Sequence, residues 1–384
     1  MLSIWSFKFR EVMIMTLPIR VLQVIGIMNR GGAENMIMNL YRNIDRSKIQ
    51  FDFVEHTETE AAFDSEILSL GGIVFHCPRY QGINHLTYIA WWKRFLQMHA
   101  DKYIAVHGHI GSTAAIYLSE AKKYGLYTIS HSHSAGGIQD IKGVLYWMLS
   151  YPTRHIANYF FSCSKTAGIT RFGKKVGNST RCRVLNNAIE TGKFAFNIKK
   201  RVVVRQELGL REDQLCVGHI GRFDKYKNQS LVIDIFDKIL KKVPDAKLLF
   251  IGDGPMRNHM EQKAITRGII SNIIFTGVRR DVDCFIMAMD IFVFPSIFEG
   301  FPLTLVEVQT SGLPCVISDT ISEECILTED LIEKCSLDCG PEVWADRLIG
   351  KSRQPRYSHR QEILKQGYDI STTANWIEGF YLGI

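Results

Sequence analysis

The sequence has no long uninterrupted apolar run. Its only candidate targeting segment is residues 1–18, where the charges of Lys8 and Arg10 interrupt the apolar side chains. A membrane-spanning helix needs about 20 predominantly apolar residues, and a signal peptide needs an uncharged apolar stretch. We therefore expect a cytoplasmic protein. Residues 1–18 are predicted to be an N-terminal extension, and Met13 or Met15 is a possible alternative translation start.

Paired cysteines are also lacking. The nine cysteines are spread along the chain, and none forms the Cys-x-x-Cys pair of a zinc ribbon or redox site. Cys335 and Cys339 stand four positions apart without a second ligand pair, so an ordinary loop is favoured there over a metal site. The cysteines are predicted to be reduced and mostly buried.

Acidic residues are scarce in the first half of the chain. Residues 1–198 hold 22 Lys and Arg against 13 Asp and Glu, whereas residues 199–384 hold 24 against 26, which gives +9 and −2. A basic half fits contact with an anionic membrane or a phosphorylated acceptor, although a solvated basic face is at least as common for any single cluster. Without a recognised binding motif or an arginine-rich block, no nucleic-acid partner is expected.

From Ile19 onward, short β-branched runs alternate with longer amphipathic stretches, and the pattern occurs twice. This alternation predicts an α/β fold of two Rossmann-like, doubly wound domains with parallel sheets. A polar, basic stretch at residues 191–212 is the predicted linker. Ligands of such sheets bind at the carboxyl ends of the strands, so a cleft between the domains is the expected site.

The predicted strands and helices are as follows. The first domain has strands at 20–27, 51–55, 72–75, 103–107, 127–130, 159–162 and 183–186 and helices at 33–44, 85–98 and 112–124. The second has strands at 216–220, 246–251, 273–275, 291–294 and 315–317 and helices at 229–242, 255–267 and 302–312. The predicted boundaries are 19–198, 199–367 and a terminal helix at 368–384, capped by Asp369 or Ser371.

The most informative motif is FPSIFEGFPLTLVEVQTSGLP at residues 294–314. It joins a buried strand to a helix through a loop with glycine and proline, and Pro302 suits the first turn of that helix. The free amides of a helix start favour an anion such as a diphosphate. Glu299 in the loop and Glu307 in the helix can accept hydrogen bonds from hydroxyl groups on either side of that diphosphate. By spacing alone the two acids would be weak evidence, since acids around helix starts are frequent.

The Glu-Gly-x-Pro-(four residues)-Glu arrangement after a strand ending in Phe-Pro-Ser resembles the retaining GT-B glycosyltransferases of family four. The likeness extends from Ile19 over nearly the whole chain. It implies GT-B architecture with an acceptor-binding first domain, a nucleotide-sugar-binding second domain, and a C-terminal helix that crosses back onto the first. The subgroup it resembles most builds capsular or extracellular polysaccharide, which implies a hexosyltransferase that uses a UDP-sugar and a saccharide or lipid-linked saccharide acceptor.

The resemblance also implies the donor-binding residues. The loop GRFDKYKN at 221–228 is similar to the family's diphosphate-binding loop, with Arg222 and Lys227 as the cations. Fixed cations and helix amides can stabilise the leaving diphosphate, so no metal and no cofactor are expected. The loop FTGVRRD at 275–281 implies contact between the base and the Val278 backbone, although Asp281 is also typical of a helix cap. The remaining implied donor contacts are Gly300, Phe301, Pro302 and Leu303.

In the first domain, Gly31-Gly32 follows the first strand and opens a helix, so amides near Gly32 could meet the donor phosphate. His131 and His133 end the fifth strand, where family members place a histidine beside the donor sugar; either could hydrogen-bond a sugar hydroxyl or relay a proton. With Glu299 they are the catalytic candidates. His107 and His109 are weaker candidates on the acceptor side.

Three other functions stay open from the sequence. A nucleotide-sugar epimerase of the same fold would bind the donor without transferring the sugar, but its own catalytic acids are not recognised. A non-catalytic saccharide-binding protein would tolerate loss of Glu299, Arg222 and Lys227, all of which are present. A nicotinamide-dependent oxidoreductase is disfavoured because the glycines after the first strand do not match the dinucleotide fingerprint, although Glu55 could supply its acid.

Overall fold

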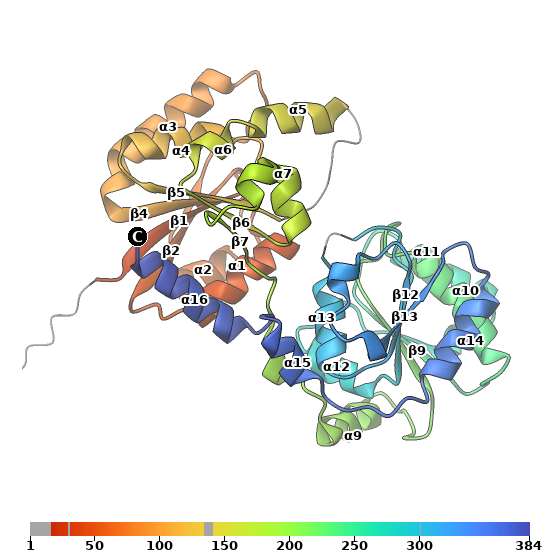
Figure 1. The fold of residues 1–384 in the computed structure, drawn as a ribbon. Coiled ribbons are helices and arrows are strands. Elements are labelled where there is room, and N and C mark those ends of the chain that lie inside the picture. Colours follow the sequence, from red (N-terminus) through yellow and green to blue (C-terminus); the bar gives the residue numbers. More distant parts are fainter. Residues whose placement is uncertain (1–16, 30, 134–140, 300) are drawn as a thin grey trace, which may run out of the picture.

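The computed structural model describes residues 17–29, 31–133, 141–299 and 301–384. The predicted N-terminal extension therefore lies almost entirely outside the described residues. Within them, the chain forms two parallel sheets flanked by helices (Figure 1). This confirms the predicted α/β fold with two Rossmann-like units.

The first sheet has seven strands in the order β3-β2-β1-β4-β5-β6-β7, and every pairing in it is parallel. Its strands are β1 (Ile19–Ile25), β2 (Ile49–Glu55), β3 (Val74–His76), β4 (Tyr103–Gly108), β5 (Tyr127–Ser132), β6 (Tyr159–Ser162) and β7 (Cys182–Val184). The central strands are buried on both faces, which explains why they read as near-continuous apolar runs.

Helices cover both faces of this sheet. They are α1 (Gly32–Asn43), α2 (Asp64–Ser69), α3 (His85–His99), α4 (Ala114–Lys123), α5 (Ile141–Ser150), α6 (Thr153–Ile156) and α7 (Lys165–Gly177), with the short turn η1 (Ala100–Lys102). One core, around Phe51 and Phe53, packs against α1; the other, around Trp92 and Tyr117, packs against α3 and α4. The α2, α5, α6 and α7 helices were not predicted from the sequence.

The second sheet has six strands in the order β10-β9-β8-β11-β12-β13, again all parallel. They are β8 (Cys216–Ile220), β9 (Lys247–Ile251), β10 (Ile273–Phe275), β11 (Ile291–Phe294), β12 (Cys315–Ser318) and β13 (Ile332–Cys335). The edge strand β13 was missed because Glu333 and Lys334 break its apolar pattern.

The helices around the second sheet are α10 (Gln229–Leu240), α11 (Arg257–Thr266), α12 (Val282–Ala288), α13 (Leu303–Thr310) and α14 (Pro341–Lys351), with the turns η2 (Ile270–Asn272), η3 (Glu323–Cys325) and η4 (Glu329–Leu331). Cores lie on both faces of this sheet as well. Thr166 at the start of α7 donates a hydrogen bond of 2.8 Å to Glu324, which joins the two domains.

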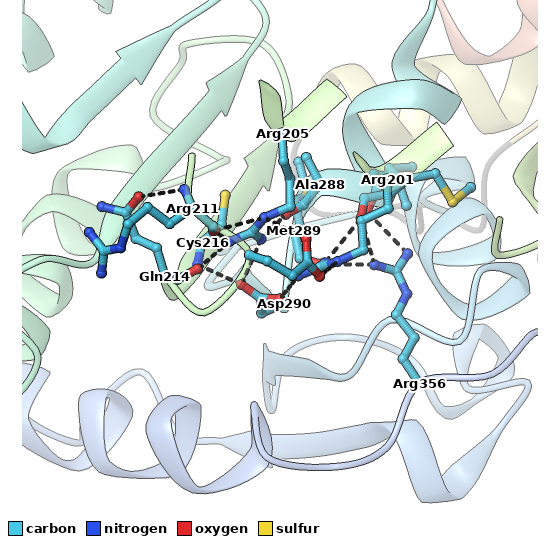
Figure 2. A network of polar contacts seen from close by, with 12 residues as sticks. Arg201, Arg205, Arg211, Gln214, Cys216, Ala288, Met289, Asp290 and Arg356 are labelled. Carbon is cyan, nitrogen blue, oxygen red and sulfur yellow. Dashed lines mark hydrogen bonds and ion pairs between the residues drawn. The ribbon is translucent and has the colours of Figure 1, made fainter. Parts of the chain in front are cut away.

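The stretch predicted as a linker, residues 191–212, contains two helices, α8 (Thr191–Phe194) and α9 (Ile198–Glu207). The arginines of α9 fasten it to the second domain, as Figure 2 shows. Arg201 and Arg205 both bind the Asp290 carboxylate, and Arg205 also donates to the Ala288 carbonyl at 2.7 Å. This stretch is therefore largely a packed part of the second domain, because its charges meet carbonyls at the end of α12.

A later segment joins the same network. Arg356, which follows α14, donates to the carbonyls of Ile286, Met287 and Met289 at 3.1, 3.3 and 2.8 Å (Figure 2). Cations at a helix C-terminus satisfy carbonyls that lack partners in the helix. The network therefore fastens α9, at the start of the second domain, and the segment of Arg356, near its end, to the same end of α12.

The chain ends with α15 (Arg360–Lys365) and α16 (Ile370–Leu382). Asp369 caps α16 by accepting from the amides of Ser371 and Thr372, so the first of the two predicted caps is confirmed. The α16 helix packs on the first domain beside α1, and its Ile377 and Tyr381 are buried in that core. The predicted crossover of the C-terminal helix is confirmed.

All nine cysteines are free, and most of them are buried. No helix in the described ranges combines the length and the apolar character needed to cross a bilayer.

Candidate functional site

The loops after β8 and β11 meet at the carboxyl end of the second sheet. The Ile297 amide donates to the Tyr226 carbonyl at 2.7 Å, and the Asn228 side chain donates to the Pro295 carbonyl at 3.2 Å. Asn228 has a φ of 55°, a left-handed conformation that asparagine tolerates better than most residues. These contacts hold the two predicted donor-binding loops against each other.

Lys227 and Glu299 form an ion pair between these loops, with a distance of 2.6 Å from Nζ to Oε1. Their side chains are only 19% and 13% exposed. The same ammonium lies 4.9 Å from the centre of the Phe294 ring. An ammonium has three donors, so Lys227 can hold Glu299 and still present hydrogens to an anion. The structure thus brings together two residues that are 72 positions apart in sequence.

The loop after β8 packs closely against the turn after β9. The Gly221 amide donates to the Ile251 carbonyl at 3.0 Å. Gly252 has a φ of 131°, and a Cβ there would lie 2.1 Å from the Gly221 carbonyl oxygen. Only glycine allows so close an approach of two backbones. Arg222 lies in the supported loop with its side chain exposed, and its carbonyl accepts from Gln229 at 2.8 Å.

The helix after β11 begins one residue later than predicted. It spans Leu303–Thr310, and Pro302 precedes it in an extended conformation with φ −76° and ψ 108°. Pro302 is therefore the N-cap residue, and its own conformation is not helical. Glu307 is half-buried on this helix, and burial together with the neighbouring Asp283 raises the pKa of its carboxyl to about 7.

The remaining residues predicted to contact the donor differ in how exposed they are and in what they pack against. The Phe301 ring stacks on Tyr368 with centroids 5.5 Å apart, and Leu303 packs against the same small core, so both side chains help hold the segment in place. Gly300 lies outside the described residues. Val278 is 62% exposed, which leaves its backbone open to a ligand. Asp281 precedes α12 but does not cap it through its side chain, because its carboxylate pairs with Arg279 at 2.7 Å.

Four histidines gather at the carboxyl ends of β4 and β5 in the first domain. His107 and His131 are buried within the strands, and His109 and His133 follow them half-buried. The rings of His131 and His133 stack with centroids 4.1 Å apart, and those of His107 and His131 are 5.3 Å apart. All four lie on one face because side chains of a strand alternate and the pairs are two residues apart.

Hydrogen bonds order this histidine cluster. His109 Nε2 lies 2.8 Å from Gln23 Oε1, and His109 Nδ1 lies 2.7 Å from His133 Nε2. The Gln23 oxygen can only accept, so His109 carries its proton on Nε2 and accepts from His133 through Nδ1. His133 Nδ1 then has a free lone pair, and the described residues supply no partner for it.

Burial keeps these imidazoles neutral. It lowers the pKa of His133 to about 4 and that of His107 to about 3, and it holds those of His109 and His131 well below the ordinary value. A neutral imidazole of such low basicity suits hydrogen bonding to a hydroxyl better than proton relay near pH 7. Neutral ring nitrogens are also metal ligands, and the candidate ligand atoms of His107, His109 and His131 lie within 4.8 Å of one another.

The residues around Lys227 and Glu299 in the second domain and the histidine cluster in the first domain are two candidate half-sites. Comparison with known proteins bears on both. Residues 201–349 match the family model described as "Glycosyl transferases group 1". The Bacillus subtilis protein EpsF, named as a glycosyltransferase, is 32% identical over 373 residues, which cover 94% of this chain and 96% of EpsF. This chain belongs to the group 1 glycosyltransferases.

Two more distant proteins are similar to this glycosyltransferase. The Escherichia coli UDP-Gal:alpha-D-GlcNAc-diphosphoundecaprenol alpha-1,3-galactosyltransferase is 24% identical over 250 residues, covering 62% of this chain and 64% of that enzyme. The structure of Anabaena HepE in complex with UDP superimposes with a TM-score of 0.78 at 15% identity, covering 95% of this chain and 100% of that one. The structural likeness confirms the GT-B fold.

The family model covers only one of the two candidate half-sites. The matched range 201–349 contains Arg222, Lys227, Glu299 and Glu307, whereas the histidine cluster lies in the first domain, within the range aligned to EpsF. Among the described residues, no hydrogen bond or ion pair links the cluster to Glu299.

The glycine pair of the first domain starts a helix as predicted, with Gly31 as its N-cap and Gly32 as its first residue. Glu55 ends β2 fully buried, and burial with the nearby Asp64 raises the pKa of its carboxyl to about 8. A buried neutral carboxyl cannot serve as the exposed acid that a dinucleotide site needs. This finding argues further against the oxidoreductase interpretation.

The sequence interpretation missed Gln23 and Tyr381. Gln23 holds His109, and the Tyr381 hydroxyl lies 2.6 Å from His107 Nδ1 although the two residues are far apart in sequence. The one available signal for Gln23 was a polar residue in the middle of an apolar strand. Nothing in the sequence signalled the contact of Tyr381 with His107, because only the crossover of α16 brings Tyr381 to the histidine cluster.

Proposed function

We propose that this glycosyltransferase is a retaining enzyme that moves a hexose from a nucleoside-diphosphate donor, UDP-sugar in our expectation, to a saccharide or lipid-linked saccharide in cell-surface polysaccharide synthesis. The observation that carries this proposal is the Lys227–Glu299 ion pair. It sets a cation suited to a diphosphate beside a carboxylate suited to sugar hydroxyls. The names of the E. coli relative and of the HepE complexes with UDP and UDP-glucose support the donor class.

In the proposed transfer, the bond between the sugar C1 and the diphosphate oxygen breaks with its electron pair staying on the diphosphate, and the acceptor oxygen bonds to C1 and gives its proton to water. Negative charge then grows on the leaving diphosphate. Arg222, Lys227 and the first amides of α13 would stabilise that charge without a metal, because preorganised donors need no rearrangement during the reaction.

The remaining roles follow from geometry and protonation. Glu307 would accept hydrogen bonds from the ribose hydroxyls, and the Val278 backbone would contact the base. Of the two histidines, His133 is the better candidate for the donor sugar, because it is half-buried whereas His131 is buried within the strand. A UDP-sugar held in this way would lie between the two domains at the cytoplasmic face of the membrane.

The test is release of nucleoside diphosphate from a panel of nucleotide-sugars in the presence of EDTA. We expect release from one donor, and a loss of about 100-fold or more in Arg222→Ala and Glu299→Ala, typical of lost transition-state stabilisation. Arg353→Ala, an exposed arginine of the same domain, is the matched control. Dependence of the rate on a metal would contradict the metal-free mechanism and point to the histidine cluster. The anomeric configuration of the product tests retention.

Two other outcomes would replace the proposal. Binding of a donor with interconversion of its sugar and no transfer would indicate an epimerase. No binding of any donor, even with membrane extract as a source of acceptor, would indicate a non-catalytic saccharide-binding protein.

A further inference from the structure

The α5 helix presents an apolar stripe to solvent. Val144, Trp147, Met148 and Tyr151 are 42%, 38%, 60% and 39% exposed. Their spacing of three, four and seven positions places them on one face of a helix, and the hydrogen bond from the Tyr151 amide to the Trp147 carbonyl continues that helix to Tyr151. A surface helix usually turns such a stripe toward the core. Figure 1 shows α5 at the upper edge of the first domain.

The surroundings of this stripe are strongly basic. Residues 141–189 contain eight Lys and Arg and no Asp or Glu. Among them, Lys165, Lys174 and Lys175 on α7 are exposed. Arg154 links the two helices, because its guanidinium lies 3.9 Å from the centre of the Tyr151 ring and 3.5 Å from the Arg171 carbonyl of α7. Arg154 therefore connects the end of the apolar stripe to the basic helix α7.

The dimensions of α5 restrict how it could meet a bilayer. Its ten residues extend over roughly 15 Å, about half the hydrocarbon thickness, so it can lie in the membrane interface but cannot span the bilayer. Trp and Tyr are enriched at such interfaces because an apolar ring carries a polar end. Basic side chains beside an apolar stripe attract anionic lipids.

We propose that α5 and α7 form a docking surface for an anionic lipid bilayer, in which the stripe enters the headgroup region and the α7 lysines face lipid phosphates. The α5 helix follows β5, the strand that carries His131 and ends just before His133. Docking through α5 would thus hold the first-domain half-site close to the membrane. The link to a lipid-linked acceptor rests on the proposed function, but the docking does not.

A second copy of the chain is a less suitable occupant of this surface. In a two-fold dimer the same patch meets itself, so the basic residues of one copy would face those of the other. With no acidic residue in the segment 141–189 to offset them, such a contact is repulsive.

The experiment is co-sedimentation of the full chain with vesicles, without donor or acceptor. We expect binding to vesicles that contain phosphatidylglycerol, weaker binding to phosphatidylcholine alone, and release by high salt. Trp147→Ser/Met148→Ser and Lys174→Glu/Lys175→Glu should each lower partitioning by about tenfold or more. Leu68→Ser, a residue 58% exposed on α2, and Lys241→Glu, 64% exposed on α10's C-cap, are matched controls.

A second measurement reports insertion directly. Trp147→Phe keeps the stripe apolar, so it should bind vesicles like the wild type but lose the part of the fluorescence quenching by brominated lipid that Trp147 contributes. Unchanged vesicle binding in both double variants would overturn the proposal, as would equal binding to neutral and anionic vesicles. A dimer that dissociates on Trp147→Ser/Met148→Ser would assign the stripe to a second copy. Release of nucleoside diphosphate in solution is measured separately, so failure of docking and failure of the transferase proposal are distinguishable.

Discussion

Glu307 is the residue whose protonation should be visible in donor binding. Its pKa is raised to about 7 by burial, so the carboxyl changes charge within the working range of the enzyme. The ionised form accepts hydrogen bonds through both oxygens, whereas the protonated form has given up part of that capacity. For stability the sign is opposite. The neutral carboxyl stabilises the fold below the unfolded pKa, and this contribution is lost as pH rises through about 7.

We predict that donor affinity falls by about tenfold when pH is lowered from roughly 8 to 6, because charge-assisted hydrogen bonds are about twice as strong as neutral ones. Glu307→Gln should bind weakly with an affinity that barely changes over this range. Calorimetric titration with the donor at several pH values measures both. A wild-type affinity that does not change with pH would show that Glu307 does not hold the donor.

The histidines give a second prediction for single residues. His133→Ala should lower transfer by about 10- to 100-fold, as for loss of one positioned polar group, with little change in melting temperature. His131→Ala should lower the melting temperature, because His131 is only 3% exposed in the sheet. Since the pKa of His133 is lowered to about 4, the pH-rate profile of Glu307→Gln, which lacks the carboxyl that changes charge near 7, should show no histidine inflection near 6.5. An inflection there in Glu307→Gln would assign proton relay to the cluster.

Among elements, the turn after β9 supports the loop that is predicted to bind the donor, and a substitution in this turn tests that support. Gly252→Ala would set a Cβ against the Gly221 carbonyl and hold a non-glycine residue at a φ of 131°. We expect destabilisation by about 2–4 kcal/mol and weaker donor binding, because the loop with Arg222 and Lys227 must shift.

Gly379→Ala on α16 is the matched control, since a Cβ there meets no atom within 4 Å. That substitution should be neutral or should stabilise by up to about 1 kcal/mol, the helix preference of alanine over glycine. Urea unfolding of both variants measures the difference. Equal stability of the two would mean that the turn relaxes without strain.

The elements also show which sequence patterns were informative. The predicted strands are all present, with ends shifted by up to two residues, because buried parallel strands require apolar runs. The short helices α8 and α9 were hidden, since the charges of Arg201 and Arg205 resemble a solvated linker until Asp290 and the α12 carbonyls are seen beside them. Pro302 was assigned to the helix because the sequence does not give its ψ.

For the whole molecule, the crossover of α16 ties the end of the chain to the first domain. Ile377 is fully buried in that domain's core, and Lys48 forms an ion pair of 2.9 Å with Glu378. We predict that Ile377→Ala destabilises the protein by about 2–4 kcal/mol, the usual range for a large-to-small change in a core.

Leu382→Ala, at a side chain 50% exposed, should change stability by less than about 0.5 kcal/mol. Calorimetry is the suitable measurement, because two domains can unfold in separate transitions. A loss confined to the second-domain transition in Ile377→Ala would contradict the packing of α16 on the first domain.

The sequence by itself determined the alternation of strands and helices and the parallel sheets. These follow from local rules, since strand periodicity and turn glycines act over a few residues. The donor-binding roles of Arg222, Lys227, Glu299 and Glu307 rest on the family resemblance and stay predictions. Only the tertiary structure decided that Lys227 pairs with Glu299, that Gln23 orients His109, and that Tyr381 reaches His107. Each of these contacts joins segments distant in sequence, and burial, which sets the protonation of Glu307 and His133, depends on the whole fold around them.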